Sequence, residues 1–254
     1  MYKEKIYENK KIIIFMLFII FASSLGYLNT YINIWNNHDY NFCKIDLVLL
    51  ILKPNYIGTF LSIFTAYLSI YITKFDFNTN LILRYKSKKV IWFRQSVHII
   101  FNSFIIICSV VIFDFIIGII YRRVTYNWDS EDSLFFRVSH GMVAYDKQHI
   151  AIISTIIIGT LIISIISIIC NLIYWITNSQ IMAILITICF CLWNVYKPGL
   201  YFDLFSKTKL NAIDFVTGNK LVLDISVLPL ILIALIFLSL FIIRKKEFLN
   251  DTRR

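Results

Sequence analysis

The chain has 254 residues and a formal net charge of +10, with 59% apolar residues against only 16% charged ones. Soluble domains usually carry about 25% charged residues, so an ordinary water-soluble fold is excluded. Seven glycines and three prolines also exclude collagen-like and low-complexity chains. The apolar residues form long uninterrupted runs, which are typical of an integral membrane protein.

Six apolar runs predict transmembrane helices within a single transmembrane domain, 1–254. A helix rises ~1.5 Å per residue, so ~20 residues cross a hydrocarbon core of ~30 Å. The fifth run is short, and the fourth must tilt or protrude. Because the runs are continuous and do not alternate, they favour an all-α fold over a β-barrel. The expected spans are 12–31, 56–73, 97–121, 150–176, 181–196 and 225–243.

The distribution of lysine and arginine predicts the orientation. With the N-terminus inside, the internal segments hold 15 basic residues in 49 positions, and the external segments hold 10 in 80. Basic residues concentrate on the cytoplasmic side of membrane proteins, so both termini are expected in the cytoplasm. The positive charge is then mainly a topology signal. A nucleic-acid-binding protein would instead cluster its basic residues on a folded polar face.

Two short segments have more than one interpretation. The small residues 22–24 follow a basic start and an apolar run, which resembles a signal-peptide cleavage site. The apolar run continues through Leu28, so we favour a first helix that stays attached. The segment 47–52 is too short to span a bilayer and is expected to be a partly buried external segment.

Ionisable residues are almost absent from the predicted spans. Asp114 is the one clear exception, seven residues from the outer end of the third span. Such residues are costly in a membrane and often mark a translocation path. Asp114 could line such a path, or it could bond to Asn171 or Asn194 on a neighbouring helix, and we favour the structural role. No catalytic, metal-binding or covalent cofactor motif is present, so an enzyme is not expected.

The five cysteines suggest no disulfide and no metal site. Four of them lie inside apolar runs, which leaves Cys43 as the one external cysteine. A single external thiol cannot pair within the chain, and the Cys-x-Cys spacing at 189–191 does not match zinc sites. Cys43 is expected to react with an impermeant thiol reagent on intact cells.

The segment 74–96 is the one internal loop large enough to contact a cytoplasmic partner. The sequence lacks the glycine-rich phosphate-binding loop, so ATP-driven work would need a separate ATP-binding subunit. Apolar residues in this segment precede a basic cluster, as in an amphipathic helix that docks in a groove. The alternative is a simple membrane anchor with aromatic residues at the headgroups. The residues concerned are Leu81, Ile82, Leu83, Arg84, Tyr85, Lys86, Lys88, Lys89 and Trp92.

Together these features resemble the permease subunits of type 2 ABC exporters. The resemblance rests on six spans, internal termini, the basic segment 80–94, and a substantial external segment before the last span. Within that family the chain is most similar to the small permeases of Gram-positive exporters for membrane-active peptides such as phenol-soluble modulins and bacteriocins. Many type 2 permeases begin with an amphipathic surface helix, for which residues 1–11 are too few.

The resemblance implies partners and further structure. It implies a homodimer, or a pair with a sister permease, in the plasma membrane of a bacterium. Two separate ATPase subunits would bind ATP and magnesium, and this chain would hold no cofactor. The segment 74–96 would contain the coupling helix, and residues 194–227 would form short re-entrant helices at the outer face.

Aromatic residues could line a path for an amphipathic peptide cargo. Phe60, Phe64, Tyr67 and Tyr71 recur at three- and four-residue spacing and should share one helix face. Tyr27, Tyr31 and Tyr56 could contribute, although tyrosines at such spacing more often pack helices together. Two other classes remain open: an accessory or immunity protein that acts by binding, and an ion-coupled carrier, for which internal repeats would be expected.

Overall fold

The computed structural model describes residues 2–73, 87–196, 214 and 218–244. These residues contain helices and loops and no strand, apart from an isolated bridge between Asn41 and Ser133. The predicted all-α fold is therefore confirmed for the described part of the chain. The elements are α1 (Tyr2–Asn37), α2 (Lys44–Leu49), η1 (Leu50–Leu52), α3 (Pro54–Tyr56), η2 (Ile57–Leu61), α4 (Ser62–Thr73), α6 (Lys88–Ile120), α7 (Leu134–Val138), α8 (Gln148–Thr177), α9 (Gln180–Tyr196) and α11 (Asn219–Arg244).

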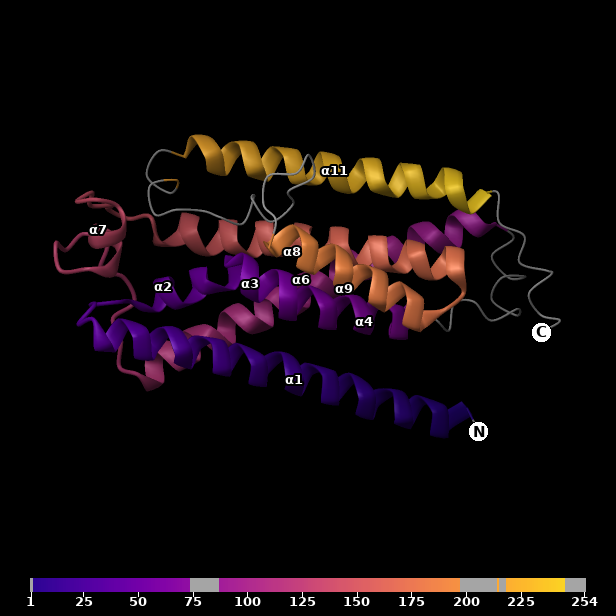
Figure 1. Cartoon of the computed structure of the whole chain (residues 1–254), viewed down its shortest axis with the longest axis horizontal. Coiled ribbons are helices and arrows are strands. Elements are labelled where there is room, and N and C mark those ends of the chain that lie inside the picture. The colour runs from indigo at the N-terminus through magenta and orange to yellow at the C-terminus, as the bar shows by residue number, and fades with distance from the viewer. Residues whose placement is uncertain (1, 74–86, 197–213, 215–217, 245–254) are drawn as a thin grey trace.

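Long apolar helices indicate a multi-pass membrane protein. Five helices in the described ranges are long and apolar enough to cross a membrane, and α9 is an apolar helix of 17 residues. α1 begins and α11 ends at the same end of the molecule, which we name the terminal end (Figure 1). α2 and α7 lie at the opposite end, which we name the cap end. Six crossings and the side that faces the cytoplasm stay predictions.

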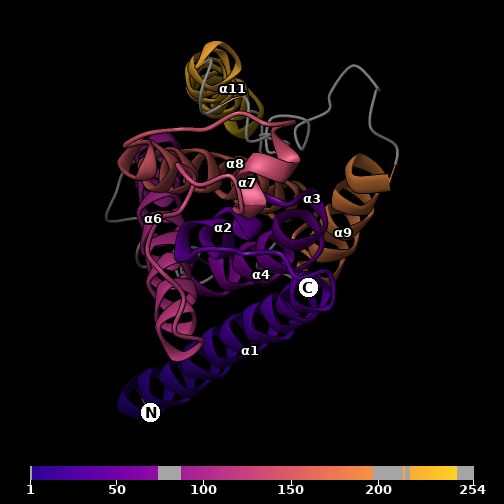
Figure 2. The same cartoon turned by 90° about the vertical axis from the view of Figure 1, so that its left-hand side faces the viewer.

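α8 is the central helix of the bundle. It packs against α4, α6, α9 and α11, whereas α1 packs against α6, α4 and η2. In the most apolar window of α8, 67% of the residues are buried, compared with 17% in those of α1 and α11. Figure 2 shows α1 and α11 on opposite sides of the bundle. α8 therefore has protein neighbours on most sides, and the outer two helices keep broad apolar faces exposed.

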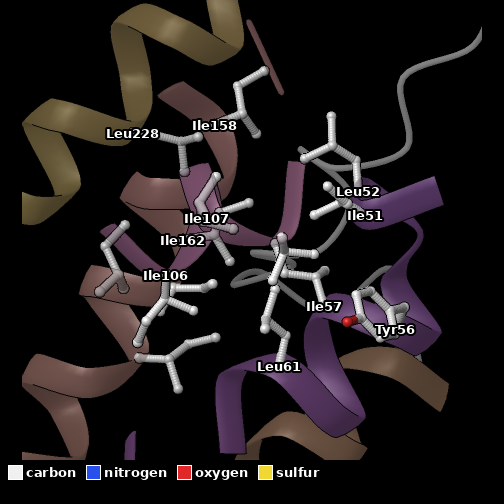
Figure 3. Close-up of a cluster of buried hydrophobic side chains, with 14 of the residues drawn as sticks. Ile51, Leu52, Tyr56, Ile57, Leu61, Ile106, Ile107, Ile158, Ile162 and Leu228 are labelled. Carbon is white, nitrogen blue, oxygen red and sulfur yellow. The ribbon is translucent and has the colours of Figure 1, made fainter. Parts of the chain in front are cut away.

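Small residues bring the central helices close together. An added Cβ at Gly159 of α8 would lie 3.0 Å from Ile107 Cδ1 of α6, so glycine permits this approach. Figure 3 shows Ile107 among Ile158 and Ile162 of α8 in the buried core. On α4, the buried Ser69 and Thr73 hydroxyls bond to carbonyls of their own helix, as Ser69 does to Thr65 at 2.8 Å. Packing of this kind holds helices together where lipid supplies no hydrophobic driving force.

The cap end is a folded unit made of two loops that are far apart in the sequence. The Leu134 amide donates to the Asn41 carbonyl at 2.8 Å, and the Lys44 amide donates to the Val124 carbonyl at 3.0 Å. The Arg123 guanidinium lies 3.9 Å from the centre of the Phe42 ring. The segment 47–52, expected to be partly buried, lies in α2 and η1 and is almost entirely buried.

Three helix boundaries differ from the predicted ones. α1 runs continuously from Tyr2, so residues 2–11 extend the first helix and form no separate element. α6 begins at Lys88, nine residues before the predicted start, so the internal loop is shorter than expected. α11 begins at Asn219, so residues 219–227 belong to the last long helix and not to a separate re-entrant helix, whereas residues 197–213 and 215–217 of that predicted segment lie outside the described residues. In each case the helix extends into polar residues, and hydropathy averaged over a sequence window ends the predicted span before them.

Candidate functional site

Asp114 is buried in the half of α6 nearest the cap end. Asp114 is 1% exposed and lies six positions before the end of α6. The Ser24 hydroxyl on α1 donates to Asp114 Oδ1 at 2.9 Å. In the described part of the chain, no lysine, arginine or histidine lies within ion-pair distance of this carboxyl. The partner is therefore Ser24, and the expected bond to Asn171 or Asn194 is wrong.

Tyr56 brings a second polar group to the same place. It is 2% exposed, and its hydroxyl has no hydrogen-bond partner among the described residues. The phenol lies within hydrogen-bonding reach of the Ser23 and Ser24 hydroxyls, although no well-aligned bond joins them, and within electrostatic reach of Asp114. Pro54, in the first helical turn, fixes the start of this helix, and a π-helical turn, η2, follows directly after Tyr56. Such π turns occur frequently at functional sites.

Aromatic rings connect this place to the cap end. Tyr27 stacks on Tyr56 with ring centres 4.9 Å apart, and the Tyr27 hydroxyl donates to that of Tyr31 at 3.3 Å. Tyr31 meets Trp35 edge-on at 5.8 Å, and Trp35 lies 5.0 Å from Phe42. We name the polar part of this arrangement the cap-end site. It consists of Ser24, Tyr27, Tyr31, Tyr56 and Asp114.

A separate polar cluster lies near the terminal end and joins three helices. Gln95 Oε1 on α6 accepts from Trp175 Nε1 at 2.8 Å and from Asn171 Nδ2 at 3.3 Å. Gln95 Nε2 donates to the Thr73 carbonyl at 3.3 Å, and the Thr73 hydroxyl lies 3.0 Å from Asn171 Oδ1. All four residues are buried. We name them the terminal-end network, which ties the end of α4 and the start of α6 to α8.

The predicted coupling residues divide between two regions. Leu81, Ile82, Leu83, Arg84, Tyr85 and Lys86 lie outside the described residues. Lys88, Lys89 and Trp92 lie in the first turns of α6 and not in a loop. Trp92, predicted as a coupling residue or, in the alternative interpretation, as a headgroup anchor, is fully buried and meets Trp175 edge-on with ring centres 5.5 Å apart. The helix extends because its buried face continues toward α8.

The four aromatic residues that were predicted to share one face of η2 and α4 differ in their exposure. Phe60 is 45% exposed, Phe64 and Tyr67 are partly buried, and Tyr71 is buried. The π-helical turn that contains Phe60 has a wider spacing per turn than an α-helix, which rotates Phe60 away from the later residues. Helical spacing was therefore an incomplete guide to this face. In contrast, Tyr27, Tyr31 and Tyr56 do come together.

Cys43 is buried, so the expected labelling of its thiol on intact cells is wrong for the folded protein. The folded loops at the cap end bury this cysteine. The Cys43 amide donates to Asp46 Oδ2 at 2.9 Å, and Trp128 Nε1 donates to Asp46 Oδ1 at 2.9 Å. Burial raises the pKa of Asp46 above its ordinary value, although these hydrogen bonds oppose the shift. Burial likewise raises the pKa of the Cys43 thiol.

Several important residues were not evident as site residues. Ser24 was considered only as part of a cleavage motif, yet it bonds to Asp114 from within α1. Gln95 was assigned to a loop, although a glutamine beside an apolar run is a signal for a helix–helix bond. Asp224 was placed one residue outside the sixth span, and it is fully buried on α11. Asp114 is therefore not the one buried carboxyl in a long apolar helix.

Comparison with protein-family models, with curated proteins and with solved structures finds no match for this chain.

Proposed function

We propose that this chain is the membrane-spanning permease subunit of an ATP-driven exporter. The exporter moves amphipathic peptides or similar membrane-active cargo out of the cell. A separate ATPase subunit docks on the basic segment 74–96, and a second permease, identical or related, completes the membrane part. The proposal rests on the resemblance of residues 80–94, the missing phosphate-binding loop, and one feature of the fold.

That feature is the attachment of both flanks of the segment to the central helix. Thr73 ends α4 directly before the segment, and Gln95 lies in the first turns of α6 after it. The terminal-end network joins both residues to Asn171 and Trp175 of α8. A force applied to the segment by an ATPase would therefore reach the helix that contacts most of the bundle, as energy coupling requires.

A second candidate is an ion-coupled carrier. It is favoured by the buried Asp114, because carboxyls at depth often carry protons or cations. The two candidates differ in whether an ATPase is needed. An accessory or immunity protein would need neither an ATPase nor the segment 74–96.

Copurification tests the proposed function. The double variant Leu83→Asp and Arg84→Glu should release the ATPase, since burying a leucine is worth ~1.5–3 kcal/mol and the new carboxylate would be stranded in the groove. Lys53→Glu is the matched control, because Lys53 is an exposed lysine outside the segment 74–96 and a surface charge contributes ~0–1 kcal/mol. Protease accessibility checks that the variant is inserted normally. An ATPase that stays bound to the double variant would contradict docking on this segment.

A further inference from the structure

Asp114 is an under-bonded carboxyl in an apolar environment. An ionised carboxylate that is removed from water needs a cation or several donors, and otherwise it binds a proton and becomes neutral. Asp46 has several donors, because one N–H group bonds to each of its two carboxylate oxygens at 2.9 Å. Asp114 has one such donor among the described residues, the Ser24 hydroxyl. Oδ2 of Asp114 is therefore the atom available to take a proton.

The groups around Asp114 are consistent with a neutral site. α1 contributes Ser24 and Tyr27, and α3 contributes Tyr56, none of which is a cation. On α2, the Lys44 ammonium lies 5.4 Å from the centre of the Phe115 ring, and its stem packs at Gly118, one turn from Asp114. The other titratable residues on helices that pack against α6 are Asp46 on α2, Tyr67 and Tyr71 on α4, His149, Cys170 and Tyr174 on α8, and Lys220, Asp224 and Arg244 on α11, together with Tyr31 on α1 and Tyr2, Lys3, Glu4, Lys5, Tyr7, Glu8, Lys10 and Lys11 near the start of α1.

Tyr56 supplies a partner suited to both protonation states. A tyrosine hydroxyl both donates and accepts, so it can donate to the carboxylate or accept from the protonated carboxyl. The Tyr56 hydroxyl is buried and has no partner among the described residues, although it lies beside Ser24 and near Asp114. Leaving a buried hydroxyl unpaired is costly. A proton on Asp114 would give that hydroxyl a hydrogen bond to accept.

We propose that the cap-end site is a proton-binding site, with Asp114 as the acceptor, Ser24 and Tyr56 as its hydrogen-bond partners, and Tyr27 and Tyr31 as the route to the cap end. The proton comes from a hydronium ion at the cap end: one of its O–H bonds breaks, one O–H bond forms on Asp114 Oδ2, and a water molecule remains at the cap end. The route rests on the hydroxyl contact of Tyr27 with Tyr31, and the stacking of Tyr27 on Tyr56 places these phenols beside Tyr56. The proposed site consists of residues of this chain alone and does not depend on an ATPase partner.

Infrared spectroscopy of the purified full chain in lipid vesicles tests the site. In a pH titration, the parent should show the carbonyl band of a protonated carboxyl group. Asp114→Asn should lose one component of that band, the one that shifts in Ser24→Ala, and Asp46→Asn, a matched change at another buried carboxyl, should keep that component. Ser24→Ala should move the band to higher wavenumber, because the carbonyl loses the hydrogen bond that weakens it. A band that is unchanged in both Asp114→Asn and Ser24→Ala at every pH would overturn the proposal.

Exchange into deuterated water tests the route. Tyr27→Phe should slow the exchange of the proton on Asp114, because it removes the hydroxyl that bonds to Tyr31. Tyr40→Phe is the control, since Tyr40 stacks on His38 in the cap and lies outside the route. Equal exchange rates in the parent and in Tyr27→Phe would overturn the route. These experiments need no ATPase, so their failure is distinct from failure of the proposed function.

Discussion

Two buried polar clusters on α6 differ in how fully their hydrogen bonds are satisfied. Gln95 and Asp114 are 19 residues apart, which corresponds to ~28 Å along a helix. Around Gln95, four side chains from three helices share their donors and acceptors. Around Asp114, one donor meets the carboxyl, and the neighbouring Tyr56 hydroxyl is unpaired in the described part of the chain.

This difference suggests that the two clusters on α6 have different roles. A fully satisfied network is rigid and fixes how helices pack, and removing one member strands the others. An under-satisfied carboxyl can change its protonation state, and such groups occur at functional sites. We infer that the terminal-end network holds α4, α6 and α8 in register, whereas the cap-end site responds to its surroundings. The three predictions below test this contrast, beginning with the largest effect.

The first prediction decides which cluster is near the outer face. Tyr145, between α7 and α8, is 68% exposed at the cap end. In a Cys189→Ser background, which removes the exposed native thiol, Tyr145→Cys should react fully with an impermeant thiol reagent on intact cells. Lys89→Cys, at the terminal end, should react only after the membrane is opened. The reverse pattern would place the terminal-end network toward the outside and invert the topology.

The second prediction breaks the terminal-end network. Gln95→Leu removes the acceptor shared by Trp175 and Asn171, and each stranded buried donor costs ~1–3 kcal/mol. We expect the free energy of unfolding to fall by about 2–4 kcal/mol, measured by thermal or denaturant unfolding in detergent. Ser109→Ala is the control on the same helix, because its hydroxyl bonds only to the Ile105 carbonyl of α6. Its effect should be about 0.5 kcal/mol or less. Equal effects would remove the contrast between the two clusters.

The third prediction concerns Asp114 and has the smallest effect on stability. Asp114→Asn keeps an acceptor for the Ser24 hydroxyl and resembles the neutral carboxyl, so the free energy of unfolding should change by ~1 kcal/mol or less. The measurement is the same unfolding experiment as for Gln95→Leu. A loss as large as that of Gln95→Leu would contradict this prediction and remove the contrast between the two clusters.

The sequence by itself determined the class of the protein and the approximate position of its helices. Hydrophobic runs depend only on composition along the chain, so the long apolar helices and the all-α fold could be predicted. Their ends could not, because α6 and α11 continue into polar residues that only tertiary contacts bury, as at Gln95 and Asp224. A hydropathy window averages over such residues and stops before them.

Only the tertiary structure decided which polar groups meet. The sequence singled out Asp114 as a costly residue, but Ser24 lies 90 positions away and its contact depends on how α1 packs against α6. Cys43 was expected to be accessible because its segment was predicted to be external, yet the folded cap buries it through Asp46 and Trp128. Spacing along a chain predicts which residues share a helix face, and the packing of helices determines what that face contacts.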